Sequence, residues 1–348
     1  MKIESESMAS TTVSIPKQMT AAVFRDPRPV SDNPLSIETV DVPRPESGQV
    51  LLRVKACGAC RTDLHIVEGE LPQLRNPLIP GHQVVGEVVS CPDESHALGA
   101  RVGLVWLGGA DGTCPYCRLD AENLCDNPIF TGYSVDGGFA QFALARADFA
   151  IPLPAALDDV HTAPLLCAGV IGFRSLRVAD VRKGEHVGLF GFGASAHLAL
   201  PVLQHWGCEV YVSTRGDSHQ QLAESLGANW VGAERDKPPK PLDRAITFAP
   251  SGDVVVAALS SLRKGGVVAI NAIHLDRMPE FDYDSLLWGE RQIRSVANVT
   301  RTDAHEFLKI AAEIGLQPEV AEFPLAKANQ ALQAIKNDAV NGAAVLRP

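Results

Sequence analysis

The chain has 348 residues, of which 46% are hydrophobic and 21% are charged, and its formal net charge is −10. That length favours two domains over one, because single hydrophobic cores seldom grow beyond roughly 250–300 residues. The acidic balance and the lack of a basic cluster argue against nucleic acid and anionic membranes as partners. No apolar run approaches the roughly 20 residues that cross a bilayer.

The N-terminal segment 1–18, MKIESESMASTTVSIPKQ, has neither the apolar core of a signal peptide nor an arginine-rich amphipathic pattern. We therefore predict that it is a polar extension. The sequence holds eight cysteines. With no export signal, CxxC spacing in a chain of this length indicates metal or redox chemistry more often than disulfides. The cytoplasm is the expected compartment.

Residues 19–166 are predicted to form a β-rich domain. Short alternating or β-branched runs are separated there by Pro and Gly, which mark turns and loops. The predicted strands are Thr20–Phe24, Val50–Ala56, Val84–Ser90 and Phe139–Leu144.

Residues 167–298 change to alternating strands and helices, which is typical of a doubly wound parallel sheet. The expected strands are Glu185–Phe190, Glu209–Ser213, Arg244–Phe248 and Val267–Ile270, and the expected helices are Ala194–Trp206, Ser218–Leu226 and Val254–Leu262.

The last segment, 299–348, is predicted to return to the first domain. A helix over Arg301–Gly315 is expected to take Thr302 or Asp303 as its N-cap, and Ala343–Leu346 reads as a strand.

Three soft ligands lie far apart in the sequence: Cys60 in C-R-T-D-L-H, His82 in G-H-Q, and Cys167 in L-L-C-A-G. Two thiolates and one imidazole can hold Zn²⁺ and leave the fourth tetrahedral position for water or substrate, which defines a catalytic zinc site. Cys57 forms a CxxC with Cys60 and is an alternative redox partner. The Thr-Asp-x-His context of Cys60 favours a packed, spectator thiol at position 57.

A glycine-rich turn follows these ligands. The strand over 187–190 leads into G-F-G-A-S-A, a G-x-G-x-x-A that precedes a predicted helix. Glycines there permit a tight turn and let backbone N–H groups approach a pyrophosphate at the helix N-terminus. An ordinary glycine turn is the alternative, but the strand–helix context favours a dinucleotide site. The residues expected to contact the cofactor are Gly191, Gly193, Ala194, Ser195 and Ala196.

The end of the next strand distinguishes NAD from NADP. A carboxylate there would bind the ribose 2′-hydroxyl of NAD, but the sequence has Ser213, Thr214 and Arg215. Small hydroxyls and a guanidinium suit a 2′-phosphate, because Arg makes charge-assisted, bidentate bonds to phosphate. NADP(H) is favoured over NAD(H), although Asp217, which lies slightly too far along the sequence, could still serve NAD.

A second ligand cluster, at intervals of three, three and eight residues, consists of Asp111, Cys114, Cys117 and Cys125. A carboxylate oxygen is an acceptable zinc ligand, and three clustered thiols without a metal would oxidise readily. We therefore expect a structural zinc here and two zinc ions per chain. The alternatives are a lobe without metal, in which Asp111 is merely solvated, and a zinc ribbon that binds nucleic acid, which the acidic composition disfavours.

These motifs together resemble the zinc-dependent medium-chain alcohol dehydrogenases. The resemblance rests on C-R-T-D-L-H, G-H-Q-V-V-G, the cysteine cluster and L-C-A-G before G-x-G-x-x-A, in that order, and covers the chain from about Met19 to its end. It implies a two-domain α/β fold, in which a GroES-like catalytic domain and a Rossmann domain enclose the active site in a cleft. It also implies a small alcohol or aldehyde substrate and a homodimer or homotetramer.

The resemblance assigns roles to single residues as well. It implies that Cys60, His82 and Cys167 bind the catalytic zinc. The Thr62 hydroxyl would then take the proton of the alcohol, and His65 would pass it outward. Arg61 is implied at the cofactor pyrophosphate. Leu71 and Trp106 are implied in the substrate pocket.

The sequence departs from the family pattern in three places. Gln83 replaces the usual Glu after the zinc-binding His, so one anion near the metal is missing. The Gly342-Ala343-Ala344 stretch lacks the Arg that the family often places on the cofactor phosphates, and Asp111 replaces a thiolate.

Two rival functions remain open. One is a zinc-free quinone or enoyl reductase on the same fold, which the three soft ligands disfavour. The other is a non-catalytic nucleotide-binding protein that keeps the metal lobe for stability. Two zinc ions per chain would support the dehydrogenase, and one would support either rival.

Overall fold

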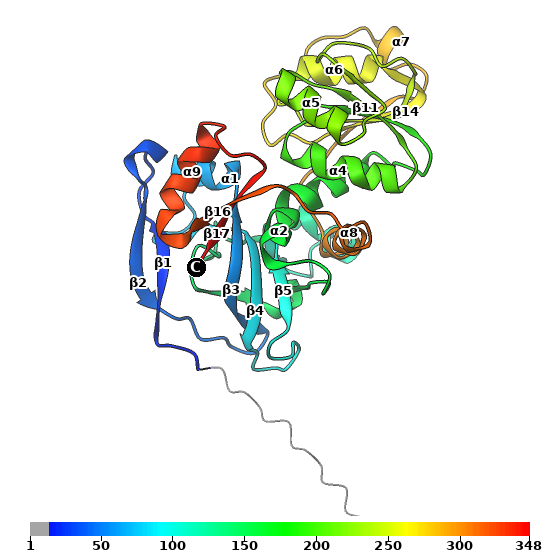
Figure 1. Cartoon of the computed structure of the whole chain (residues 1–348). Helices are drawn as coiled ribbons and strands as arrows, with labels where there is room; N and C mark the ends of the chain where they lie inside the picture. Colours follow the sequence, from blue (N-terminus) through cyan, green and yellow to red (C-terminus); the bar gives the residue numbers. More distant parts are fainter. Residues whose placement is uncertain (1–13) are drawn as a thin grey trace, which may run out of the picture.

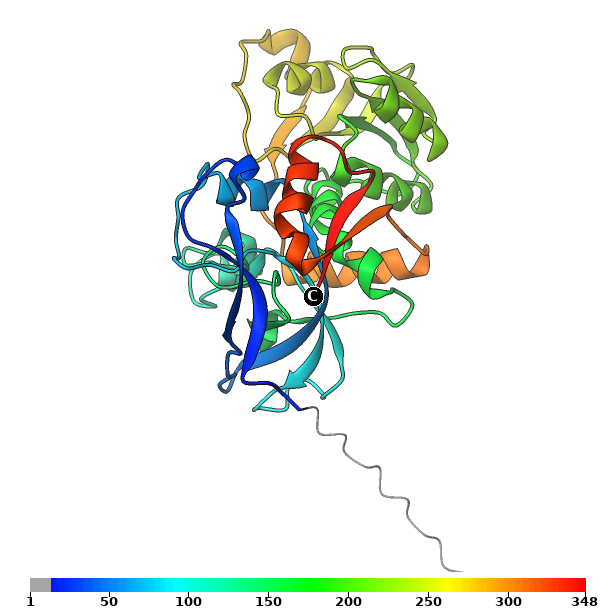
Figure 2. The same ribbon diagram turned by 60° about the vertical axis from the view of Figure 1, so that its left-hand side comes forward.

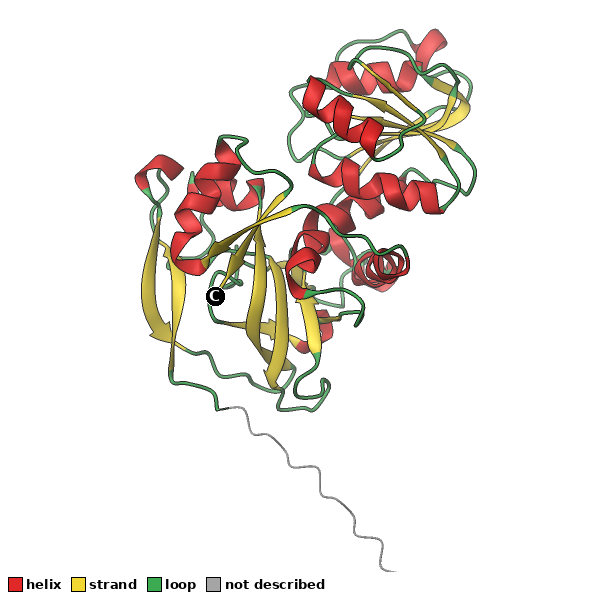
Figure 3. Ribbon diagram, in the orientation of Figure 1, coloured by secondary structure: helices red, strands yellow, loops and turns green. Residues whose placement is uncertain are grey.

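A computed structural model describes residues 14–348 of the protein. Its strands form two large sheets, one mixed and one parallel, with helices around them (Figures 1 and 3). The predicted polar extension, 1–18, lies mostly outside the described residues, and β1 begins at Gln18. Within the described part of the chain, no helix is long and apolar enough to cross a membrane.

The first domain is built on β3 (Gln49–Ala59). Strands β4 (Gln83–Ser90), β8 (Phe142–Arg146) and β17 (Ala343–Arg347) all pair with it in antiparallel fashion. Successive residues at the start of β3 are buried, so both faces of this strand are covered. The other strands of the domain are β1 (Gln18–Phe24), β2 (Leu35–Asp41), β5 (Arg101–Leu104), β6 (Leu107–Gly109), β7 (Ile129–Phe130), β9 (Ile151–Pro152) and β16 (Val320–Pro324).

The second domain is a six-stranded sheet in the order β12-β11-β10-β13-β14-β15, and every pair in it is parallel. The strand order reverses between β10 and β13, which is where open α/β sheets bind ligands at their carboxyl ends. The strands are β10 (His186–Phe190), β11 (Glu209–Ser213), β12 (Trp230–Gly232), β13 (Leu242–Thr247), β14 (Leu262–Ile270) and β15 (Gln292–Ser295); the helices are α4 (Ala194–His205), α5 (Asp217–Ser225), α6 (Gly252–Ser260) and α7 (Tyr283–Leu286). The predicted doubly wound sheet is confirmed. The helix predicted over Val254–Leu262 begins and ends two residues earlier than expected, at Gly252 and Ser260, because Leu262 already begins β14.

A helical path connects the two domains. It consists of α2 (Asp159–Pro164), a π-helical turn over Leu165–Gly169, and α3 (Val170–Val178). The chain returns through α8 (Arg301–Glu313), and the Arg301 side chain there bonds Glu122 of the first domain. The helical path thus links the two domains, and the ion pair joins the returning segment to the first domain.

The N-cap prediction for α8 is wrong. Neither Thr302 nor Asp303 is the cap: Thr300 is, and its side chain accepts the N–H of Asp303 at 3.1 Å. Asp303 accepts the N–H of Thr300 in return at 2.8 Å, which completes a capping box. The predicted acid is therefore the third helical residue, where its charge also complements the helix dipole.

The C-terminal segment lies against the first domain. Strand β17 pairs with β3, β16 pairs with β17, and α9 (Ala328–Lys336) covers them beside the N-terminal strands (Figure 2). The first sheet is therefore assembled from both ends of the sequence.

Candidate active site and metal centres

Cys60 stands at the junction of β3 and α1 (Arg61–Val67), where it is the N-cap of the helix. Its Sγ accepts the N–H of Thr62 at 3.4 Å, and its own N–H donates to Asp63 Oδ2 at 2.9 Å. These reciprocal capping bonds satisfy free donors at the helix start and fix the direction of the thiol.

Asp63 ties Cys60 to the turn that carries His82. The Asp63 side chain is fully buried, and its Oδ1 accepts the N–H of Gly81 at 3.2 Å. The same oxygen is 3.5 Å from His82 Nδ1. Gly81 has φ +95°, and a Cβ there would stand 2.3 Å from the Phe139 ring, so only glycine allows this close turn.

Cys167 completes the cluster from the interdomain helix. It lies in the π-helical turn, and such turns are frequent at functional sites. His82 Nε2 is 3.5 Å from Cys60 Sγ and 3.4 Å from Cys167 Sγ, and the three ligand atoms all lie within 4.8 Å of one another. Three distant segments thus converge where the two domains meet.

The electrostatics of this cluster favour the charged forms of Cys60 and His82 and the neutral form of Cys167. A hydrogen bond from Cys167 and the nearby imidazole hold the pKa of the Cys60 thiol well below its usual value, in spite of burial. Burial opposes a charge on His82, but the Cys60 thiolate and the Asp63 carboxylate outweigh it and raise the pKa of His82 to about 10. The Cys60 thiolate and burial raise the pKa of Cys167. A divalent cation would relieve this repulsion between the two sulfurs.

Thr62 and His65 share one face of α1, because they are three residues apart on the helix. His65 Nδ1 is 2.5 Å from Glu70 Oε2, and the His65 ring meets the His274 ring edge-on at 6.2 Å between centroids. The predicted pyrophosphate contact, Arg61, is next to Thr62 in the helix but forms an ion pair at 2.5 Å with Asp338, in the loop before β17. Both partners of that ion pair are exposed.

Trp106 forms a wall beside the ligand cluster. Its ring meets the edge of the His82 imidazole at 5.1 Å between centroids, and it stacks on Phe130 at 5.1 Å and on Tyr133 at 5.6 Å. The Tyr133 hydroxyl donates to the carbonyl of Pro72 at 2.6 Å, next to Leu71. Both predicted pocket residues, Leu71 and Trp106, are half-buried against the same core of the first domain.

The second ligand cluster folds as predicted around one point. The ligand atoms of Asp111, Cys114, Cys117 and Cys125 all lie within 4.8 Å of one another. Backbone N–H groups donate to two of the thiols: Asp111 and Asn127 to Cys125 at 3.3 Å each, and Cys117 to Cys114 at 3.4 Å. Such N–H···S bonds stabilise thiolates, the form that binds a metal.

Asp111 is held ionised by its neighbours. Asn127 Nδ2 donates to its Oδ2 at 3.0 Å, and the N–H groups of Thr113 and Cys114 donate to its Oδ1 at 2.8 and 2.9 Å. The Asn127 hydrogen bond and these backbone donors hold the pKa of Asp111 far below its usual value. Desolvation and the adjacent sulfurs of Cys114 and Cys125 raise the pKa of Cys117 to about 12, so this thiol needs a metal to deprotonate near neutral pH.

The glycine-rich turn lies between β10 and α4. Gly191 has φ +87°, and a Cβ on it would stand 3.0 Å from the backbone nitrogen of Ala249, so both conformation and space require glycine. Gly193 is the N-cap of α4, and the space beside its Cα is empty. Ala194, Ser195 and Ala196 form the first turn of α4, whose N–H groups are available to a phosphate.

The residues expected to select the cofactor follow β11. Ser213 and Thr214 are buried, and the Thr214 N–H donates to the carbonyl of Gly232 at 3.1 Å. The side chain of Arg215 is 75% exposed and its Nε is 3.3 Å from Glu234. The carboxyl end of the strand therefore carries an exposed guanidinium that is paired with the Glu234 carboxylate.

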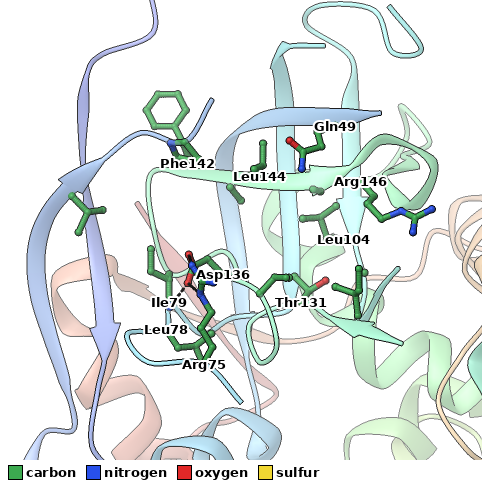
Figure 4. A pocket seen from close by; sticks show the side chains of 18 of the residues that line it. Gln49, Arg75, Leu78, Ile79, Leu104, Thr131, Asp136, Phe142, Leu144 and Arg146 are labelled. Carbon is green, nitrogen blue, oxygen red and sulfur yellow. Dashed lines mark hydrogen bonds and ion pairs between the residues drawn. The ribbon is translucent and has the colours of Figure 1, made fainter. Parts of the chain in front are cut away.

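A separate cavity of about 500 Å³ lies within the first domain (Figure 4). Leu78, Leu104 and Phe142 are among its apolar walls, and an ion pair between Arg75 and Asp136 lies at one side of it. None of the predicted site residues, all of which the structure describes, lines this cavity. It is distinct from the converging ligands.

Comparison with known proteins agrees with this architecture. Residues 46–155 match the model of the alcohol dehydrogenase GroES-like domain. The chain is 45% identical over 335 residues to the Mycobacterium tuberculosis (strain CDC 1551 / Oshkosh) protein named probable alcohol dehydrogenase AdhA, covering 94% of this chain and 97% of that protein. It is 35% identical over 324 residues to an alcohol dehydrogenase of Geobacillus stearothermophilus, covering 90% and 95%. The crystal structure of AibC has a TM-score of 0.87 at 28% identity and covers 95% of this chain and 96% of that one.

The fold and these relatives define an oxidoreductase that acts between alcohols and carbonyl compounds with a nicotinamide cofactor. The chain belongs to the zinc-dependent medium-chain alcohol dehydrogenase family. Its first domain is GroES-like and its second is a Rossmann domain, as the sequence motifs predicted.

Sequence reasoning missed several residues of the site. Glu70 reaches His65 only because the chain turns back after α1, and Phe130 and Tyr133 reach Trp106 only through tertiary packing. No spacing in the sequence marks these contacts. Arg61 is predicted to contact the cofactor, and no pattern in the sequence predicts its ion pair with Asp338, 277 residues away.

Proposed function

We propose that this protein is a zinc-dependent dehydrogenase that interconverts alcohols and aldehydes or ketones by hydride transfer to and from NADP(H). The observation that carries the proposal is the convergence of Cys60, His82 and Cys167, whose ligand atoms lie within 4.8 Å of one another at the junction of the two domains.

The donor set fits Zn²⁺. Two thiols and one imidazole are preferred zinc ligands, and three protein ligands leave one tetrahedral position for substrate. Asp63 Oδ1, 3.5 Å from His82 Nδ1, adds support, because metal-binding imidazoles usually give their second N–H to a carboxylate or carbonyl. A zinc ion held there would supply the Lewis acidity that makes an alcohol easier to deprotonate.

The residues of the chain itself would move the proton and shape the pocket. The Thr62 hydroxyl can accept the proton of the alcohol while it donates its own, and His65 on the same helix face can receive it, since imidazoles titrate near neutral pH. Trp106, held by stacking on Phe130 and on Tyr133, would orient the substrate and exclude water. A nicotinamide cofactor held at the turn from Gly191 to Ala196 would supply the hydride acceptor or donor.

We propose NADP(H) as the preferred cofactor. Arg215 supports this, because its guanidinium at the end of β11 is 75% exposed and could exchange its contact with Glu234 for a 2′-phosphate. The chain has no carboxylate at the carboxyl end of β11, where Ser213, Thr214 and Arg215 follow one another, and Asp217 is the first residue of α5.

We propose a second, structural zinc on Asp111, Cys114, Cys117 and Cys125. The donors fit because N–H···S bonds favour thiolates and because Asp111 is kept ionised. Each carboxylate oxygen has two lone pairs, so the bonds that Asp111 already accepts leave room for a metal.

The assembly proposed is a homodimer or homotetramer. Strand β15 is the outermost strand of its sheet, and Tyr283 and Trp288 in the segment before it are 53% and 64% exposed. Open edges and exposed aromatic side chains are typical of interfaces. We also propose a cytoplasmic location, which the eight free cysteines support.

The decisive experiment combines activity and metal content on one sample. Primary, secondary and aromatic alcohols and the matching aldehydes are assayed with NAD(H) and NADP(H) separately, and zinc is counted by mass spectrometry. The proposal expects two zinc ions per chain and NADP-linked alcohol oxidation.

A matched pair of cysteine variants tests the catalytic site. Cys60→Ala should lose one of the two zinc ions and nearly all activity. Cys57→Ala should keep both zinc ions and the activity, because Cys57 is buried in the core and its thiol donates to the backbone carbonyl of Gly58. One zinc per chain in the unmodified protein, with no alcohol-dependent reduction of either cofactor, would favour the zinc-free reductase or the non-catalytic nucleotide-binding protein.

A further inference from the structure

Glu70 lies at the outer end of the proposed proton relay. Its Oε2 is 2.5 Å from His65 Nδ1, and its backbone N–H donates to the His65 carbonyl at 2.9 Å. The N–H of Leu71 donates to the same carbonyl at 3.3 Å. The chain therefore turns back onto the end of α1, and Glu70 is joined to His65 by a main-chain bond and a side-chain bond.

The charged side chains near Glu70 bind other partners, so the Glu70 carboxylate interacts with His65. Glu68, two residues earlier, accepts the N–H of Val30 at 3.1 Å and binds Lys336 Nζ at 2.5 Å. Within the described residues, His65 is the one hydrogen-bond partner of the Glu70 side chain. The two glutamates therefore have different roles. Glu68 connects the end of α1 to α9 through Lys336, and Glu70 binds the His65 imidazole.

The chemistry of this contact selects one form of His65. An ionised carboxylate can only accept hydrogen bonds, so His65 Nδ1 must carry the hydrogen. In the neutral ring, Nε2 is then unprotonated and can accept a proton. An unrestrained histidine side chain prefers the opposite tautomer, in which Nε2 carries the hydrogen and cannot accept another.

We propose that Glu70 is a positioning residue of the proton relay, which fixes His65 in the Nδ1–H tautomer so that Nε2 receives the proton released through Thr62. This inference rests on the proposed function, because it assigns His65 a proton to carry. The balance is simple: Nε2 gains the proton, the imidazolium stands beside the Glu70 carboxylate, and Nε2 then releases the proton to solvent. The other titratable ring that faces His65 is His274, from the loop after β14.

The tautomer can be observed without turnover. In protein labelled with ¹⁵N-histidine, at a pH where imidazoles are neutral, the two ring nitrogens give distinct shifts in the protonated and unprotonated states, and His65→Gln identifies the His65 signals. We expect Nδ1 to be protonated in the unmodified protein. Glu70→Ala should move His65 to the Nε2–H form or to a mixture of tautomers.

Two further variants separate positioning from simple damage. Glu70→Gln keeps a carbonyl oxygen that can accept from Nδ1, so it should retain the Nδ1–H tautomer. Glu68→Gln changes the neighbouring glutamate and should leave the His65 signals unchanged. An unchanged tautomer in Glu70→Ala would overturn the proposal.

Kinetics complete the test. Loss of a residue that orients a functional side chain typically lowers activity about 10–100-fold. Glu70→Ala should therefore lower kcat about tenfold and leave the KM for the cofactor within about twofold. Glu70→Gln should retain most of the kcat of the unmodified enzyme. A shifted tautomer with unchanged kcat would also overturn the proposal. An unmodified enzyme without alcohol activity would instead contradict the proposed function, and the tautomer would still decide whether Glu70 fixes His65.

Discussion

Cys60 and His82 are 22 residues apart, and His82 and Cys167 are 85 apart, yet all three ligand atoms meet. The sequence predicted them because each ligand stands in a short, specific pattern whose chemistry can be read locally. Asp63, in contrast, shows its importance only in the structure, where it bonds the Cys60 and Gly81 N–H groups at once. A contact that forms only when two distant segments meet cannot be predicted from the sequence of either segment alone.

His65→Gln should slow turnover mainly below neutral pH. Without the imidazole, the proton must pass to water or hydroxide, and hydroxide becomes scarcer as the pH falls. The measurement is the pH profile of kcat for alcohol oxidation. A profile identical to that of the unmodified enzyme would remove His65 from the relay.

Arg215→Ala should weaken NADP(H) binding about tenfold to a hundredfold, because hydrogen bonds to charged groups contribute about 1.5–3 kcal/mol. NAD(H) binding should change little, since NAD lacks the 2′-phosphate. Fluorescence titration with both reduced cofactors checks this. Arg182→Ala is a matched control: this arginine is 71% exposed and precedes β10, at the opposite end of the strands. Equal loss of both cofactors in Arg215→Ala would contradict the assignment.

At the scale of elements, the proposed structural zinc would make the fold of the cysteine lobe depend on a metal. Asp111→Ala should lose the second zinc ion and lower Tm, because three thiols alone make an incomplete tetrahedral site. Asp111→Cys should keep two zinc ions per chain, since a thiolate is a better zinc ligand. Zinc counting and thermal unfolding of the two variants provide the measurement. Unaltered zinc content in Asp111→Ala would exclude Asp111 as a ligand.

The capping box of α8 supports a second prediction at this scale. Thr300→Ala should lower the free energy of unfolding by about 1 kcal/mol or more, the usual cost of a lost cap. The cost is raised because Asp303, which is fully buried, loses the Thr300 hydroxyl bond of 2.8 Å. Urea unfolding measures the change. Thr300→Ser keeps the hydroxyl and should be nearly neutral; equal effects of both variants would argue against the cap.

Strand and helix boundaries show what local pattern can and cannot specify. The strand Glu209–Ser213 was predicted to the residue, because its apolar run is bounded by polar residues and turns. The π-helical turn around Cys167 was not predicted, since its periodicity differs from α-helix only by one residue in a single turn. Helix α1 was missed because its seven residues carry ligands and capping groups as well as apolar positions.

At the scale of the whole molecule, Arg301 and Glu122 join the start of the returning C-terminal segment to the first domain. Burial opposes ionisation of Glu122, but the side-chain and backbone hydrogen bonds from Arg301 outweigh it and hold the pKa of Glu122 below its usual value. Because the pKa is lowered on folding, this contact stabilises the folded protein above about pH 4.5, and the contribution disappears as the pH falls through the lower folded value.

Glu122→Gln should therefore cost about 1–3 kcal/mol near neutral pH, the range for a hydrogen bond to a charged group. The difference from the unmodified protein should shrink as the pH drops below about 4.5, where an unfolded Glu is protonated. Urea unfolding at a series of pH values measures both quantities. A difference that stays constant or grows in acid would show that the charge of Glu122 does not stabilise the fold.

The pairing of Ala344 in β17 with Ala59 in β3 places the last strand of the chain directly beside the ligand Cys60. During translation the Rossmann domain is therefore finished and able to fold while the sheet beside Cys60, the first of the proposed zinc ligands, still lacks a strand. A nascent chain stalled before residue 343 would contain the complete Rossmann domain, but its first domain would still lack β17. Nucleotide binding should thus mature before metal-dependent activity as the protein leaves the ribosome.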